Sequence, residues 1–207
     1  VSLTENDFSG KIFETFLIPS SGNSPKILLV GAGKKSDFEN RIAKNVAGAA
    51  ARRLLKAKVK NFAFDISLFD KPELVIEGAI LAEFDPGLYK TGKDKSAKFD
   101  ELILLGKVSP SIVKRAQNIA ETTNWIRHLI AEPANKLTPK FFVNEARRIA
   151  KAGKLVIEVY DEKQAIRAGM GAFAGIAQGS HEPSYMVALK YLYKKEAKTL
   201  GVVGKGI

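Results

Sequence analysis

Residues Lys26 to Lys56 read KILLVGAGKKSDFENRIAKNVAGAAARRLLK, and they decide the fold class. The run Lys26-Ile-Leu-Leu-Val-Gly31 is apolar throughout, which is typical of a strand covered on both faces. From Ser36 to Lys56 the apolar residues recur at helical spacing, on a stripe made of Phe38, Ile42, Val46, Ala50 and Leu54. We expect Ser36 to cap this helix in a capping box with Glu39. A strand that leads into a helix is the repeating unit of an α/β protein.

The same alternation extends to both sides of this stretch. Further strands are predicted at Lys11–Ile18, Val59–Ile66 and Glu101–Gly106. A helix that Pro72 opens should run to the turn Asp85-Pro86-Gly87.

A long helix follows, with Ser109 as its cap and Pro110 at its first position. It should stop before Pro133, and at about 1.5 Å per residue it is roughly 30 Å long, enough to connect two domains. Its apolar residues form one continuous stripe made of Ile112, Ala116, Ile119, Thr123, Ile126 and Ile130.

A second α/β unit begins after this helix. Thr138-Pro139 starts a helix to Gly153, and its inward residues should be Phe142, Ala146 and Ile149. Asp161 and Gln164 predict a capping box for a short helix that Gly169 closes. Strands are predicted at Leu155–Tyr160, Tyr185–Tyr193 and Thr199–Val203.

The composition bounds the classes of function. The chain has 207 residues, 45% of them hydrophobic, and no cysteine, which excludes disulfides, thiol chemistry and thiolate metal sites. No apolar run is long enough for a membrane helix and no signal peptide is present, so we expect a cytoplasmic protein without a membrane partner. The net charge of +11 comes from lysines spread along the chain among acidic residues, which favours a solvated surface over a nucleic-acid face.

Few residues indicate a catalytic, metal-binding or phosphate-binding site by their type and spacing alone. The only histidines are His128 and His181, so a histidine-rich metal site is excluded, and a packing role is expected for His128. The turn Gly31-Ala-Gly-Lys-Lys35 completes neither glycine-rich phosphate motif, so a plain strand-to-helix turn is the better interpretation. Gly204-Lys205-Gly206 also fails as a phosphate loop.

Taken in order, several short motifs resemble the leucyl (cytosol) aminopeptidase family across essentially the whole chain. They are Leu29-Val-Gly-Ala-Gly-Lys-Lys35, Gly48-Ala-Ala-Ala-Arg52, Glu132-Pro-Ala-Asn-Lys-Leu-Thr-Pro139, Gly169-Met-Gly171, Gln178-Gly-Ser180 and Leu200-Gly-Val-Val-Gly-Lys-Gly206. The resemblance implies a macrodomain-like N-terminal sheet flanked by helices over residues 1–107, whose start is missing. A connecting helix over 108–131 and the first part of an α/β catalytic domain over 132–207 would follow. Ala131 departs from the family, where many members have Asn.

The resemblance also implies the chemistry. The family hydrolyses peptides from their N-terminus with two divalent metal ions, Zn or Mn, and Lys205 matches a lysine that is a metal ligand there. The other ligands, the second active-site lysine and the arginine lie downstream in family members. We therefore expect a fragment of an enzyme that is a hexamer at full length, and a fragment that binds the metal pair weakly and is inactive alone.

Two other functions stay open. Some family members also bind DNA, and the Lys90–Lys98 loop with Arg52-Arg53 makes a basic DNA-binding module the alternative. Binding of a small nucleotide by the macrodomain-like part is the weaker one, because the glycine motifs are incomplete.

Overall fold

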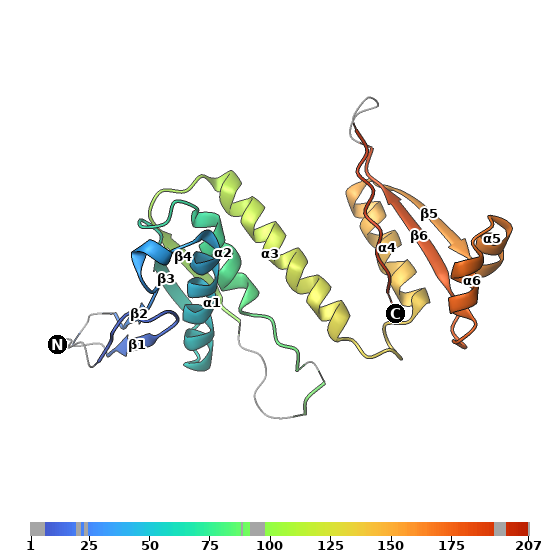
Figure 1. Cartoon of the computed structure of the whole chain (residues 1–207). Helices are drawn as coiled ribbons and strands as arrows, with labels where there is room; N and C mark the ends of the chain where they lie inside the picture. The colour runs from blue at the N-terminus through green and yellow to red at the C-terminus, as the bar shows by residue number, and fades with distance from the viewer. Residues whose placement is uncertain are drawn as a thin grey trace. The chain divides into compact units, whose positions relative to one another are not determined.

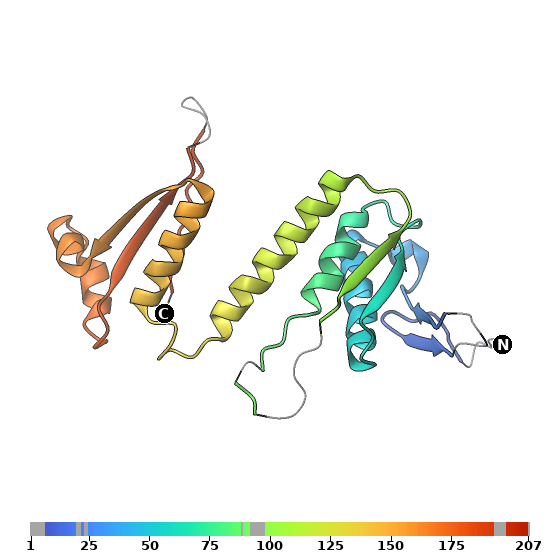
Figure 2. The same cartoon turned by 180° about the vertical axis from the view of Figure 1, so that it is seen from behind.

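The computed structural model divides the chain into two compact units, Val1–Ala131 and Glu132–Ile207. It describes residues 7–19, 22, 25–87, 89–91, 98–192 and 198–206. Strands and helices alternate within each unit (Figures 1 and 2), so the α/β class predicted from the sequence is confirmed. Among the described residues, no helix combines the length and the hydrophobicity that crossing a membrane requires.

The first strands of unit 1 form a two-stranded antiparallel sheet. β1 (Thr15–Ile18) pairs with β2 (Ile27–Val30), with Thr15 opposite Val30. β1 is shorter than predicted because residues 11–14 form a turn, in which Phe13 has a positive φ of 65° and the Glu14 N–H donates to the Lys11 carbonyl. The prediction that β2 is covered on both faces is wrong, since Ile27 is half exposed.

The first long helix, α1 (Asn40–Lys56), begins later than predicted. A short 3-10 turn, η1 (Lys35–Asp37), precedes it, and the Ser36 hydroxyl donates to Asp37 inside that turn. The predicted capping box is therefore wrong: Glu39 is the N-cap residue and its side chain makes no capping bond. The predicted stripe is confirmed for Ile42, Val46, Ala50 and Leu54, all buried, whereas Phe38 lies outside the helix.

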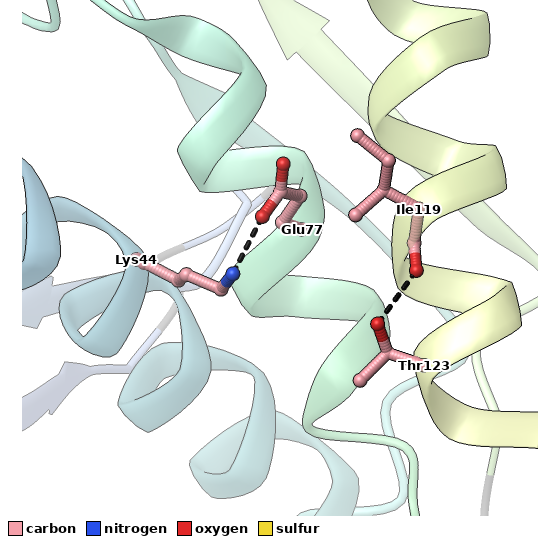
Figure 3. A network of polar contacts seen from close by, with 4 residues as sticks. All are labelled: Lys44, Glu77, Ile119 and Thr123. Atoms are coloured by element: carbon pink, nitrogen blue, oxygen red, sulfur yellow. Dashed lines mark hydrogen bonds and ion pairs between the residues drawn. The ribbon is translucent and has the colours of Figure 1, made fainter. Parts of the chain in front are cut away.

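α1 packs closely against α2 (Pro72–Leu81), which begins at Pro72 as predicted. The helices approach closely where Gly78 of α2 lies against the backbone of α1. A Cβ added to Gly78 would lie 2.1 Å from the Lys44 carbonyl oxygen. Beside this crossing, the Lys44 ammonium lies 2.5 Å from the carboxylate of Glu77, a buried acid (Figure 3). Small residues and one ion pair thus fix how the two helices meet.

The two helices cover one face of a parallel strand pair (Figure 2). β3 (Asn61–Asp65) lies beside β4 (Glu101–Leu105), with Phe62 opposite Leu102. Alternate residues point toward the helices and join two buried clusters, which Phe62, Phe64, Leu102 and Leu104 complete. On the other face of the pair, Ile103 and Leu105 are about half exposed.

The long helix α3 (Pro110–Ala131) packs on α2. The Ser109 hydroxyl accepts a bond from the Ile112 N–H, as a cap should. The side chain of Asn124 donates to the Ile80 carbonyl at 2.7 Å and thereby ties α3 to the end of α2. Of the predicted apolar stripe only Ala116 is buried, because α3 rests on α2 through Ala116 and Ala120 and leaves the isoleucines at its flank.

Unit 2 places one helix against an antiparallel pair of strands. It contains α4 (Pro139–Gly153), β5 (Val156–Asp161), α5 (Glu162–Arg167), α6 (Gly171–Ala177) and β6 (Tyr185–Lys190). β5 pairs with β6, and α4 contacts both strands. The caps predicted at Thr138 and at Asp161 with Gln164 are confirmed.

Two predictions for unit 2 fail in part or in full. The predicted inward face of α4 is confirmed for Ala146, which is buried, and is wrong for Phe142, which is half exposed, while Ile149 is partly buried. Val143 and Ala150 are the other buried residues of α4, because smaller side chains let the helix lie close to the strands. Thr199–Val203 forms no strand, since no neighbouring strand pairs with it among the described residues. β6 ends at Lys190, and Tyr193, the predicted end of that strand, lies outside the described residues.

Candidate functional site

Lys205, the candidate metal ligand, lies in an exposed segment. Residues 198–206 have no regular secondary structure, and the side chains of Leu200, Val202 and Val203 are almost fully exposed. Among the described residues, no atom lies within 4 Å of the position where a Cβ would stand on Gly204 or Gly206. Lys205 is therefore held by its own short segment and not by a built pocket.

The described residues do not by themselves fit a two-metal centre. Within the part of the chain that the structure describes, His, Asp and Glu side chains form no group of three that could hold a metal ion. Two divalent cations need several ligands, mostly oxygen atoms, and a lysine amine must first lose its proton to become a ligand. Lys205 could supply one donor atom, and no hydrolytic step follows from it alone.

The glycine-rich turn after β2 is occupied by backbone hydrogen bonds. The Gly31 N–H donates to the Glu14 carbonyl at 2.7 Å, and the Gly33 N–H donates to the Gly10 carbonyl at 3.1 Å. A Cβ on Gly31 would collide with the Lys11 carbonyl oxygen, which explains the glycine there. Because the N–H groups of both glycines are engaged within the fold, the structure favours the plain-turn interpretation over an anion site.

The two histidines lie in different surroundings, one packed and one exposed. The His128 ring packs 5.0 Å from the Phe84 ring, measured between centroids, so the predicted packing role is confirmed. Its Nδ1 atom is buried, and no hydrogen-bond partner for it lies among the described residues. His181 is exposed in the turn before β6.

A groove between α2, β4 and α3 contains a carboxyl group with a raised pKa, that of Glu83, which the sequence analysis did not single out. The groove has a volume of about 520 Å³, and Glu83, Lys98 and Glu121 are among the residues that line it. Burial raises the pKa of Glu83, and the Glu121 charge adds to the rise. The Phe99 N–H, which donates to the Glu83 carboxylate at 3.0 Å, and the Lys98 charge act in the opposite direction. The bond joins the end of α2 to the start of β4, so it positions the fold.

Comparison with known proteins gives this architecture a class. The model of the cytosol aminopeptidase family's N-terminal domain matches residues 1–93, and the model of the same family's catalytic domain matches residues 124–207. The two matched parts follow one another in the chain and belong to one family of α/β proteins. The chain belongs to the cytosol aminopeptidase family.

Individual relatives agree with this assignment. A protein of Solibacter usitatus named probable cytosol aminopeptidase is 36% identical over 97% of this chain, and one of Alkaliphilus oremlandii with the same name is 33% identical over 99%. The chain spans 44% of the length of each.

Solved structures show the same fold. A mutant of tomato leucine aminopeptidase superposes with a TM-score of 0.73 at 25% identity, covering 88% of this chain and 39% of its own. The bottromycin maturation enzyme BotP, solved in complex with Mn, reaches a TM-score of 0.76 at 24% identity over 90% of this chain and 41% of its own.

Proposed function

We propose that this chain is part of a metal-dependent aminopeptidase that removes N-terminal residues from peptides. The observation that carries the proposal is the ordered match of two domains of one family, with Lys205 inside the matched catalytic part. Within that enzyme we assign residues 1–107 to the N-terminal domain, 108–131 to a connecting helix and 132–207 to the start of the catalytic domain. The division of the structure after Ala131 supports the second boundary.

The metal chemistry belongs to the same proposal. We assign Lys205 as one ligand of a pair of Zn or Mn ions in the full-length enzyme, where the ions would polarise the peptide carbonyl and supply the attacking water. The Mn in BotP supports a divalent metal for this fold. The remaining donors would come from residues other than those described, so the 207-residue chain alone should bind the ions weakly and turn over no substrate.

The proposal extends to the location and the assembly of the protein. The names of the Solibacter and Alkaliphilus relatives support a cytoplasmic protein, and the resemblance implies a hexamer at full length. Peptides are the proposed substrates.

The first experiment tests the 207-residue chain itself for peptidase activity. The purified 207-residue chain is incubated with an aminoacyl anilide and Mn²⁺ or Zn²⁺, and no release of the aniline is expected. Measurable turnover that a chelator abolishes would show that the chain holds a complete centre, contrary to the proposal.

A second experiment restores the missing donors. The chain is joined after Ile207 to the downstream part of the Solibacter relative, and the chimera is assayed with the same substrate and ions. Lys205→Arg should abolish turnover, because a guanidinium keeps its proton and cannot bind a metal. The matched control is Lys198→Arg, a second exposed lysine in the same segment, which should keep turnover. An active Lys205→Arg chimera would remove Lys205 from the metal centre.

A further inference from the structure

The two halves of α3 are held in unit 1 by different kinds of contact. Ala116 and Ala120 are the buried residues of this helix, and no residue from 121 to 131 is buried. Apolar packing on α2 therefore fixes the helix as far as Ala120. The second half of α3, residues 121–131, needs contacts of another kind.

The sequence of this second half supports a helix only weakly. Most of its residues belong to types with lower helix propensity than alanine, leucine or arginine. These residues are Thr122, Thr123, Asn124, Trp125, Ile126, His128 and Ile130. Because the gain from extending a helix by one residue is small even for good helix formers, a run of weak ones frays unless tertiary contacts hold it.

A weak point of the helix lies where the two halves meet. The Thr123 hydroxyl donates to the Ile119 carbonyl at 2.7 Å (Figure 3). A threonine that donates in this way to the carbonyl four residues earlier slightly destabilises a helix and favours a bend. Local opening of α3 should therefore begin at this turn.

Two polar side chains of the second half bind the end of α2. The Asn124 side-chain amide donates to the Ile80 carbonyl at 2.7 Å, and the Arg127 guanidinium donates to the Leu81 carbonyl at 3.3 Å. Arg127 also donates to the side-chain oxygen of Asn124 at 3.3 Å, so each side chain orients the other. Both carbonyl groups belong to the last turn of α2, where a helix runs out of its own N–H donors.

Charge and ring contacts strengthen this attachment. α2 has no basic residue in its last turn, and Arg127 supplies the positive charge that the C-terminus of a helix favours. The Arg127 guanidinium also lies over the Phe84 ring, 5.5 Å from its centroid, and the His128 ring packs 5.0 Å from the same ring. We call the set of residues Asn124, Arg127, His128, Ile80, Leu81 and Phe84 the α2–α3 clamp.

The clamp joins residues from the two matched parts of the chain. Asn124 is the first residue of the part that matches the catalytic domain, whereas Ile80 lies in the part that matches the N-terminal domain. While α3 runs to Ala131, the linker to α4 spans only residues 132–138. We propose that the α2–α3 clamp is a conformational switch: closed, it keeps residues 121–131 helical, and open, it lets them join the linker as a hinge. The proposal is independent of peptidase activity.

Amide exchange along α3 in the intact chain tests the switch. Asn124→Leu and Arg127→Met remove the bonds to α2 and keep side chains of similar size, so each should speed the exchange of residues 124–131 at least tenfold. Residues 113–120, which apolar packing holds, should keep their exchange rates. Asn118→Leu and Arg115→Met are the matched controls, because both side chains are exposed on the first half of α3, and they should leave the exchange of residues 124–131 unchanged.

Trypsin cleavage measures the open state independently. Trypsin cuts after Arg127 only when the helix is locally open. Asn124→Leu, which keeps Arg127, should therefore raise the rate of cleavage there at least tenfold relative to cleavage after Arg115. Unchanged exchange and cleavage in the clamp variants would show that the clamp does not hold the helix. An equal increase in both halves of α3 and in α2 would also overturn the switch, because the clamp would then serve only the general stability of unit 1.

Discussion

At the scale of single residues, two glycines on the α1–α2 contact make opposite predictions. A methyl group on Gly78 would lie 2.1 Å from the Lys44 carbonyl oxygen, whereas one on Gly48 would lie 3.5 Å from the Gly78 carbonyl oxygen, an ordinary contact. Gly78→Ala should therefore force the helices apart and lower the free energy of unfolding by about 1–3 kcal/mol. Gly48→Ala should raise it by about 0.5–1 kcal/mol, because alanine favours a helix interior. Urea unfolding followed at Trp125 in α3 measures both, and similar losses in the two variants would contradict this packing.

Glu83 gives the second prediction at this scale, and it concerns pH. Because burial raises the pKa of Glu83 in the folded chain, its contribution to stability is fully present below the ordinary pKa of a glutamate. That contribution is lost as the pH rises through the higher folded value. Glu83→Gln keeps an acceptor for the Phe99 N–H and removes the buried charge, so it should stabilise the chain at neutral pH and change little near pH 4. Urea unfolding midpoints of the parent chain and of Glu83→Gln, measured from pH 4 to neutral pH, test the direction of this effect. A variant that is less stable than the parent only at neutral pH would refute the prediction.

At the scale of elements, the capping box between β5 and α5 can be tested by one substitution. The Asp161 carboxylate accepts from the Gln164 N–H at 2.7 Å, and the Gln164 side chain accepts from the Asp161 N–H at 2.9 Å. Asp161→Ala removes the first bond and should cost about 1 kcal/mol. Amide exchange in α5 should then accelerate roughly fivefold. Lys163→Ala, an exposed change inside the same helix, is the control and should leave the exchange rate nearly unchanged.

The helices and strands differ in how well the sequence predicted them. The bounds of α3 and α4 and the caps at Ser109, Thr138 and Asp161 are local properties, and the sequence predicted them well. Two other predictions depend on which segments pack together, and there the sequence pattern was a poor guide. The apolar residues of α3 were expected to form one stripe, of which only Ala116 is buried, and residues 199–203 were expected to form a strand, which the structure lacks there. The carboxyl of Glu83 shows the same limit, because its partner, the Phe99 N–H, lies sixteen residues away in the sequence. Lys205 was found only through resemblance, since its own surroundings carry no signal.

At the scale of the whole molecule, the two units differ in how much apolar surface they bury. Both buried clusters that the structure defines are in unit 1, where α1 and α2 meet β3 and β4. In unit 2 the buried apolar residues are the small Val143, Ala146, Ala150 and Ala165, while its exposed apolar residues include Leu200 and Val203. Since burial of apolar surface is the main stabilising contribution, the free energy of opening should be larger in unit 1 than in unit 2.

Native-state hydrogen exchange measures this difference directly in the intact chain. Amides in the middle of α1 should exchange at least tenfold more slowly than those in β5 and β6, because a difference of about 1.4 kcal/mol in opening free energy corresponds to a factor of ten. In urea, the signals of unit 2 should be lost before those of unit 1, so that a single two-state transition fails to fit both. Two variants assign the cause: Gly78→Ala should speed exchange in unit 1 alone, and Asp161→Ala in unit 2 alone. Coincident transitions in both units would mean that they unfold as one body, contrary to the separate cores described above.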